Sequence, residues 1–217
     1  IVKLKTFHIR TDNIFEVMSR AEKDETLFRG KIIEFQGKYS TASTFTTEWN
    51  VFRELTSRSC RKADITVADM DLIIKKFGDK SGFYLSEEQS NFFRNLFNSE
   101  ISFLLGSSGS GKSSAQAVLL EYTKVTNQSV LFLAPTGRAR KRITEVTGNV
   151  AYTIHSFIRS PKLSKQSFDI YLIDEASMID VELAEKLLGA IPTGKKIIFV
   201  GDGSQIPSVS FGNFLYD

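Results

Sequence analysis

The first third of the chain is patterned mainly for helices. Apolar residues recur at helical spacing over 12–28 and 66–77, which predicts a helix in each of these segments. Segment 40–44 is small and rich in hydroxyl groups, which favours a loop, and segment 45–55 fits a helix or a strand. We therefore predict a small, mainly helical domain over residues 1–80.

From residue 85 the pattern changes to short apolar runs that alternate with helical segments. Runs that are apolar at successive positions are typical of a parallel sheet that helices cover on both faces. We therefore predict an α/β domain over residues 81–217. Its strands are expected at 101–105, 129–134, 169–174 and 195–200, and its helices at 111–125, 138–146 and 181–188.

Composition agrees with a globular protein and excludes several classes. Of the 217 residues, 41% are hydrophobic and 24% are charged, which is near the average for soluble domains. No apolar run approaches the roughly 20 residues of a membrane span, and no signal-peptide pattern opens the chain. The single cysteine, Cys60, cannot form an internal disulfide, so we expect a reducing, cytoplasmic setting. A net charge of +3 is too small to indicate nucleic-acid binding by itself.

The strongest chemical signal is a glycine-rich segment that fits the phosphate-binding pattern G-x-x-x-x-G-K-S/T. Glycines let backbone N–H groups turn toward phosphate oxygens, and the helix that follows presents its positive N-terminus to the same anion. Lys112 would place a charge at the outer phosphates, and the Ser113 hydroxyl would bind Mg²⁺. A flexible Gly/Ser loop has a similar composition, but the predicted strand before the segment and helix after it favour a site for ATP and Mg²⁺. The predicted site comprises Gly106, Ser107, Ser108, Gly109, Ser110, Gly111, Lys112, Ser113 and Ser114.

Two further apolar strands end in polar residues that suit the same chemistry. The run 171–173 is followed by Asp174 and Glu175, and parallel strands deliver such side chains to the carboxyl edge of the sheet. Asp174 would hold Mg²⁺, and Glu175 would accept a proton from the attacking water. The next strand is followed by Gln205, whose amide can bond a γ-phosphate or orient water. Taken alone, these residues also fit a solvated strand end and a polar turn.

The order of these segments resembles a known family. The segments GSSGSGKSS, LAPTGRA, YTIHSF, LIDEASMID and FVGDGSQIPSV closely resemble the first motor domain of RecD-like DNA helicases, in the subgroup of superfamily one that moves 5′ to 3′. The resemblance covers about residues 83–217. It implies a RecA-like P-loop NTPase fold, ATP and Mg²⁺ as cofactors, and single-stranded DNA as a partner. In this family some members work inside an exonuclease complex and others alone.

The resemblance also implies roles outside the phosphate site. Gln89 would read the adenine edge, although Ser86 and Gln89 also fit an S-x-x-Q capping box. Threonine hydroxyls, backbone N–H groups and arginine suit contacts to DNA phosphates, which position a strand without reading its sequence. His155 alone would also fit a buried structural histidine, and Arg140 and Lys141 fit a solvated helix face. The residues expected to contact DNA are Pro135, Thr136, Arg138, Thr153 and His155.

The chain departs from the family pattern at its end. It stops at Asp217, just after the third major motif, so a second motor domain, with the arginines that complete the ATP site, would lie beyond it. We therefore expect a fragment of an ATP-dependent DNA helicase or translocase of recombination or repair, weakly active by itself. The alternatives are another P-loop ATPase, and a non-catalytic DNA-binding or regulatory module with a decayed ATP site.

Overall fold

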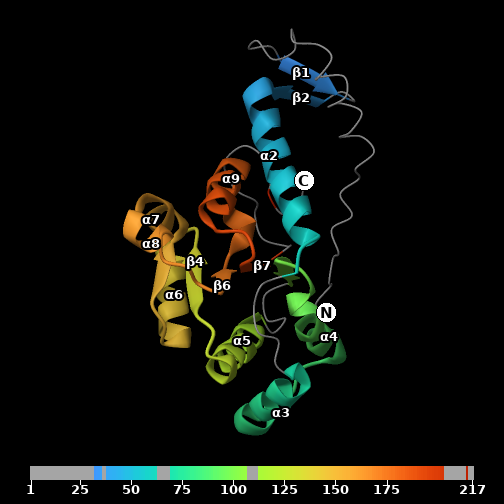
Figure 1. Cartoon of the computed structure of the whole chain (residues 1–217), viewed down its shortest axis with the longest axis vertical. Coiled ribbons are helices and arrows are strands. Elements are labelled where there is room, and N and C mark those ends of the chain that lie inside the picture. Colours follow the sequence, from blue (N-terminus) through green and yellow to red (C-terminus); the bar gives the residue numbers. More distant parts are fainter. Residues whose placement is uncertain (1–31, 36–37, 63–68, 107–111, 203–213, 215–217) are drawn as a thin grey trace.

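The computed structural model of the protein describes residues 32–35, 38–62, 69–106, 112–202 and 214. In these ranges an antiparallel pair of strands precedes three α-helices, and strands then alternate with helices (Figure 1). The strands are β1 (Ile32–Phe35), β2 (Lys38–Thr41), β3 (Ile101–Leu105), β4 (Val130–Ala134), β5 (Ala151–Thr153), β6 (Ile170–Ile173) and β7 (Lys196–Gly201). The α-helices are α2 (Ala42–Ser59), α3 (Met70–Ser81), α4 (Glu87–Asn95), α5 (Lys112–Thr126), α6 (Gly137–Thr147), α7 (Ile154–Arg159), α8 (Pro161–Ser164) and α9 (Val181–Ala190), with short 3-10 turns η1 (Leu96–Asn98) and η2 (Ala176–Met178). The predicted helix over 12–28 lies outside the described residues.

A five-stranded parallel sheet forms the centre of the fold. Its strands lie in the order β3-β7-β6-β4-β5, with Leu105 beside Gly201 and Ile173 beside Phe199. Because all five strands run in the same direction, the loops that follow them emerge at one edge. The predicted parallel sheet is confirmed, and β3 has its predicted bounds. The three-residue strand β5 was not predicted.

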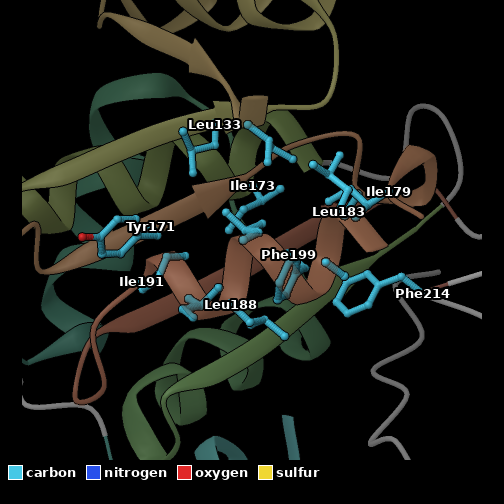
Figure 2. Packing of buried hydrophobic residues seen from close by; sticks show 14 of the residues in the cluster. Leu133, Tyr171, Ile173, Ile179, Leu183, Leu188, Ile191, Phe199 and Phe214 are labelled. Atoms are coloured by element: carbon cyan, nitrogen blue, oxygen red, sulfur yellow. The ribbon is translucent and has the colours of Figure 1, made fainter. Parts of the chain in front are cut away.

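Side chains of the central strands alternate between two hydrophobic clusters, one on each face of the sheet. In β6, Tyr171 and Ile173 belong to the first cluster and the other two residues to the second. Helices α2, α7 and α9 contribute to the first cluster, and α3, α4, α5 and α6 contribute to the second. Figure 2 shows the first cluster, where the rings of Phe199 and Phe214 lie 4.9 Å apart between centroids. Burial on both faces explains why the strands read as unbroken apolar runs.

The segment before the sheet contains more regular structure than predicted. The expected loop at 40–44 is the end of β2 and the start of α2, and the ambiguous segment 45–55 continues α2 as one helix of 18 residues. Val51 and Leu55 of this helix are buried in the first cluster. The local pattern of this segment fits a helix or a strand, and packing against α9 stabilises the helix.

The second predicted helix, α3, is shifted along the chain. It begins at Met70, because the Asp69 side chain accepts a hydrogen bond at 3.3 Å from the N–H group of the third helical residue. It ends at Ser81, because Gly82 has a φ of +70°, a left-handed conformation that glycine adopts without strain. Met70 and Ile73 are buried in the second cluster.

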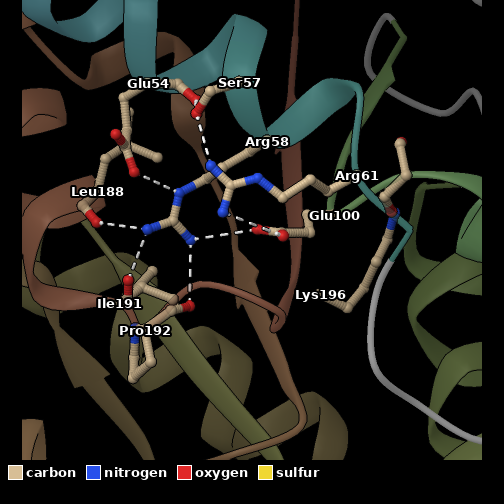
Figure 3. A network of polar contacts seen from close by, with 10 residues as sticks. Glu54, Ser57, Arg58, Arg61, Glu100, Leu188, Ile191, Pro192 and Lys196 are labelled. Carbon is tan, nitrogen blue, oxygen red and sulfur yellow. Dashed lines mark hydrogen bonds and ion pairs between the residues drawn. The ribbon is translucent and has the colours of Figure 1, made fainter.

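A buried arginine ties α2 to the end of α9. Arg58 is 2% exposed, forms ion pairs with Glu54 at 2.7 Å and Glu100 at 3.6 Å, and donates three hydrogen bonds to backbone oxygens (Figure 3). The last carbonyl groups of a helix lack partners within it, so a cation is stabilising there. The three hydrogen bonds from the Arg58 guanidinium go to the carbonyl oxygens of Leu188 at 3.2 Å, Ile191 at 2.7 Å and Pro192 at 3.1 Å.

The division of the chain into domains 1–80 and 81–217 stays a prediction. Helix α2 precedes that boundary and α3 ends across it at Ser81, and both bury side chains in the clusters that cover the sheet. In the described parts of the chain, no helix has the length and apolarity needed to cross a membrane.

Candidate nucleotide-binding site

Three neighbouring strands end at the same edge of the sheet, and two of them are followed directly by an aspartate. Strand β3 is followed by Gly106, β6 by Asp174 and β7 by Asp202. The N–H group of Gly106 donates a hydrogen bond to the carbonyl oxygen of Gly201 at 3.2 Å, so β3 and β7 stay paired up to this edge. The sheet therefore brings together the ends of three segments that the sequence singled out.

Lys112, the first residue of α5, reaches back to this edge. Its Nζ atom donates a hydrogen bond to the carbonyl oxygen of Gly106 and lies 3.5 Å from Oδ2 of Asp202. The Asp202 side chain is 2% exposed and that of Lys112 is 20% exposed. The ammonium group is thus held at a helix N-terminus, where an anion is favoured.

The first turn of α5 continues the predicted phosphate-binding segment. Ser113 and Ser114 are its second and third residues, whereas residues 107–111 and Gln205 lie outside the described residues. At the same edge Asp174 supplies one partly exposed carboxylate. This donor set fits Mg²⁺, which is usually held by one or two carboxylates together with water and substrate phosphates. Among the described residues, no group of three or more His, Cys, Asp and Glu side chains could hold a metal ion.

Asp174 and Glu175 form a tight turn after β6. The N–H group of Asp174 donates to the carbonyl oxygen of Leu133 at 3.0 Å, which ties the turn to β4. Oδ1 of Asp174 accepts a hydrogen bond from the N–H group of Glu175 at 2.9 Å. Glu175 has φ 53° and ψ 39°, in the left-handed region that residues other than glycine rarely adopt. Backbone strain of this kind concentrates at functional sites.

Two charged partners at this edge were missed from the sequence. Nη1 of Arg142, on α6, lies 3.7 Å from Oε1 of Glu175, and Asp202 pairs with Lys112. Asp202 follows an apolar strand just as Asp174 does, so its position was a usable signal. The pairing of Arg142 had no comparable signal, because a basic run on a helix reads as a solvated face.

Gln89 lies at the start of α4 and completes a capping box. Its Oε1 atom accepts a hydrogen bond from the N–H group of Ser86 at 2.9 Å, and the Ser86 hydroxyl accepts one from the N–H group of Gln89 at 3.2 Å. The capping interpretation is therefore confirmed. The Gln89 side chain is 8% exposed, and adenine recognition by its amide stays a prediction.

The predicted DNA-contacting segments follow β4 and β5, at the other end of the same sheet edge. Ala134 of β4 lies beside Thr153 of β5, so Pro135 and Thr136 lie next to the start of α7. The hydroxyl oxygens of Thr136 and Thr153 each accept a hydrogen bond from the N–H group three residues ahead, at 3.2 and 3.1 Å. These threonines begin helices α6 and α7, whose N-termini are suited to phosphate oxygens.

Two of the predicted DNA contacts present their side chains to solvent. Arg138 and His155 are exposed, so the alternative of a buried structural histidine is wrong. Arg140 and Lys141 are also exposed, and Lys141 forms an ion pair with Glu145 of the same helix at 3.8 Å. DNA contact by the predicted residues stays a prediction, and the structure brings them to one continuous edge.

Two curated proteins match part of this chain in sequence. The ATP-dependent RecD2 DNA helicase of Deinococcus radiodurans is 34% identical over 135 residues, which are 59% of this chain and 19% of that protein. The RecBCD enzyme subunit RecD of Buchnera aphidicola subsp. Acyrthosiphon pisum is 29% identical over 144 residues, which are 53% of this chain and 24% of that protein. The chain thus spans about a quarter or less of the length of these curated relatives.

Solved structures and a family model extend the comparison. The UvsW helicase from bacteriophage T4 has a similar fold, with a TM-score of 0.51 and 14% identity, over 67% of this chain and 62% of that one. The family model described as an AAA domain (AAA_19) matches residues 89–211, which are more than half of the chain. The matched span includes β3 to β7 and all the nucleotide-site residues described above. The chain therefore belongs to the AAA domain family AAA_19.

Proposed function

We propose that the chain is the first motor domain of an ATP-dependent DNA helicase or translocase of the RecD type. One observation carries this proposal: a single sheet edge holds two sets of residues side by side. The nucleotide set lies at the ends of β3, β6 and β7 and comprises Lys112, Asp174, Glu175 and Asp202. The predicted DNA contacts follow the neighbouring strands β4 and β5. A machine that couples ATP hydrolysis to movement on DNA requires such neighbouring sites.

The nucleotide half of the edge has the groups that phosphoryl transfer requires. Lys112 and the N-terminus of α5 would bind the phosphates, and Gln89 would contact the adenine. The Ser113 hydroxyl and Asp174 would hold Mg²⁺, which neutralises phosphate charge when bound. Glu175 would accept a proton from the attacking water, and Gln205 would orient that water or contact the γ-phosphate.

The DNA half of the edge suits contacts without base recognition. Thr136, Thr153 and the N-termini of α6 and α7 offer N–H and hydroxyl groups to phosphates, and exposed Arg138 and His155 add further donors. A translocase needs such contacts, because it must hold any sequence. We propose single-stranded DNA as the partner, movement from 5′ to 3′, and work in the cytoplasm either alone or within an exonuclease complex.

A second motor domain would complete the ATP site. The segments matched in two relatives are only 19% and 24% of those proteins, which leaves room in such proteins for another domain. In phosphoryl-transfer enzymes an arginine supplied from outside the primary site typically contributes about 10³–10⁵ in rate. The isolated chain is therefore expected to bind nucleotide weakly and to hydrolyse it slowly.

ATP turnover of the natural full-length protein tests this proposal. The Lys112→Ala variant should lose turnover, because the phosphates lose their main cationic partner. Equal turnover in the wild type and in Lys112→Ala would favour a non-catalytic module with a decayed ATP site. Turnover that depends on Lys112 but not on DNA would favour another kind of P-loop ATPase.

A further inference from the structure

An ion pair joins the two halves of the sheet edge. Nη1 of Arg142, on α6, lies 3.7 Å from Oε1 of Glu175, the carboxylate proposed to accept a proton from water. The Arg142 side chain is 69% exposed, whereas that of Glu175 is 22% exposed. The guanidinium therefore lies at ion-pair distance from one carboxylate oxygen and competes there with a water molecule that would donate a hydrogen bond to it.

The same arginine also lies beside a predicted DNA contact. Arg138 and Arg142 are four residues apart on α6, so their side chains share one face of the helix. Arg138 is exposed at the N-terminal turn, which begins at the cap residue Thr136. A phosphate held by Arg138 would thus lie within reach of the guanidinium of Arg142, which prefers the bidentate geometry of phosphate and carboxylate oxygens.

We infer that Arg142 is a positioning residue that couples DNA binding to ATP hydrolysis. This inference rests on the proposed function. Without DNA, Arg142 pairs with Glu175 and keeps that oxygen from water. When a DNA phosphate binds beside Arg138, Arg142 turns to the phosphate, and Glu175 is free to accept a proton from the attacking water. The exposed guanidinium can exchange partners without any movement of the buried sheet.

A neighbouring ion pair supplies a matched control. Lys141 lies 3.8 Å from Glu145 and is 75% exposed, so it resembles Arg142 in position, charge and exposure. Its partner lies on the same helix and has no place at the nucleotide site. Removing the charge of Lys141 therefore changes the surface charge of α6 without releasing Glu175.

The test is steady-state ATP turnover of the natural full-length protein, with and without saturating oligo-dT. Arg142→Gln should raise the kcat measured without DNA by about two- to fivefold, the range expected for an exposed ion pair of up to about 1 kcal/mol. The stimulation by oligo-dT should fall by the same factor, and the KM for ATP should stay unchanged. Arg142→Lys should restore most of the wild-type stimulation, and Lys141→Gln should leave the DNA-free kcat at the wild-type value.

The possible failures are distinguishable. An unchanged or lower DNA-free kcat in Arg142→Gln, with normal stimulation of the wild type, would overturn the role of Arg142 alone. An equal rise in Lys141→Gln would also overturn it, because the effect would then come from surface charge. A wild-type protein that oligo-dT does not stimulate, or whose turnover survives Lys112→Ala, would instead overturn the proposed function.

Discussion

The Nζ atom of Lys112 lies 3.5 Å from the Oδ2 atom of Asp202, a carboxylate that is 2% exposed. The two residues are far apart in the sequence and meet because β3 and β7 are neighbours in the sheet. The ammonium group that we propose for phosphate binding is therefore held in place by the protein itself. Such pre-organisation reduces the conformational cost of binding an anion.

Asp202→Asn should lower the stability of the protein in the absence of nucleotide. The substitution removes a negative charge from beside the partly buried ammonium of Lys112, which should lower the free energy of unfolding by about 1–3 kcal/mol. Chemical denaturation without nucleotide measures this change. Glu145→Gln, which removes the partner of exposed Lys141, should cost less than about 1 kcal/mol. Equal losses in both variants would show that the Lys112–Asp202 pair contributes no special stability.

Glu175→Gln should separate nucleotide binding from hydrolysis. The amide has nearly the shape of the carboxylate but cannot accept a proton from water at neutral pH, so hydrolysis should slow by about 10²–10⁴. ATP affinity should stay near the wild-type value, because Lys112 and α5 are unchanged. Single-turnover kinetics and equilibrium binding measure the two quantities separately. A wild-type hydrolysis rate in this variant would remove Glu175 from the proposed mechanism.

Arg58 should contribute far more to stability than its neighbour Arg61. Arg58→Ala leaves three carbonyl groups and the buried Glu100 carboxylate without a main partner, which should cost about 3–5 kcal/mol. Arg61 is 48% exposed and lies 3.9 Å from Glu100, so Arg61→Ala should cost about 1 kcal/mol or less. Denaturant unfolding of both variants tests the difference. Similar losses would mean that Arg58 does not fix α2 to the end of α9.

Stability should rise with pH above about 7 because of Lys196. Burial lowers the pKa of its ammonium to about 7, against the attraction of Glu100, which raises it. Its Nζ atom donates to two neutral oxygens, the carbonyl of Ser99 at 2.8 Å and the hydroxyl of Ser102 at 2.5 Å. An unfolded lysine has a pKa of about 10.4, so between the two values the unfolded state binds more protons and the free energy of unfolding increases with pH.

The size of this effect is measurable. From about pH 7 to about pH 9 the free energy of unfolding should increase by about 2 kcal/mol on account of Lys196. In Lys196→Met this contribution should be absent. Urea unfolding at both pH values, in the wild type and in the variant, measures it. Identical pH dependence in the two proteins would contradict the lowered pKa.

The sequence predicts most of the sheet because its strands are buried on both faces and carry strong local signals. Strand β3 and the residues after β6 lie where the pattern placed them. The three-residue strand β5 was missed, because so short a run carries almost no periodicity. Helix α2 was ambiguous, since its structure depends on packing against α9, about 130 residues further along the chain.

In the candidate site, too, residues with a local sequence signal were predictable and residues placed by tertiary contacts were not. Lys112, Asp174 and Glu175 lie in recognisable segments, so their types and spacing were sufficient to single them out. The partners Asp202 and Arg142 depend on which strands and helices become neighbours in space. The residues around each partner in the sequence do not indicate these pairs, because the pairs form only in the tertiary structure.

The most direct test of the central claim is ATP turnover of the natural full-length protein as single-stranded DNA is added at several salt concentrations. We expect that DNA raises turnover, that Lys112→Ala abolishes it, and that higher salt weakens the apparent DNA affinity. Arg138→Ala should reduce the slope of that salt dependence by about one. Turnover that single-stranded DNA does not change at any salt concentration would contradict the claim that this edge couples ATP to DNA.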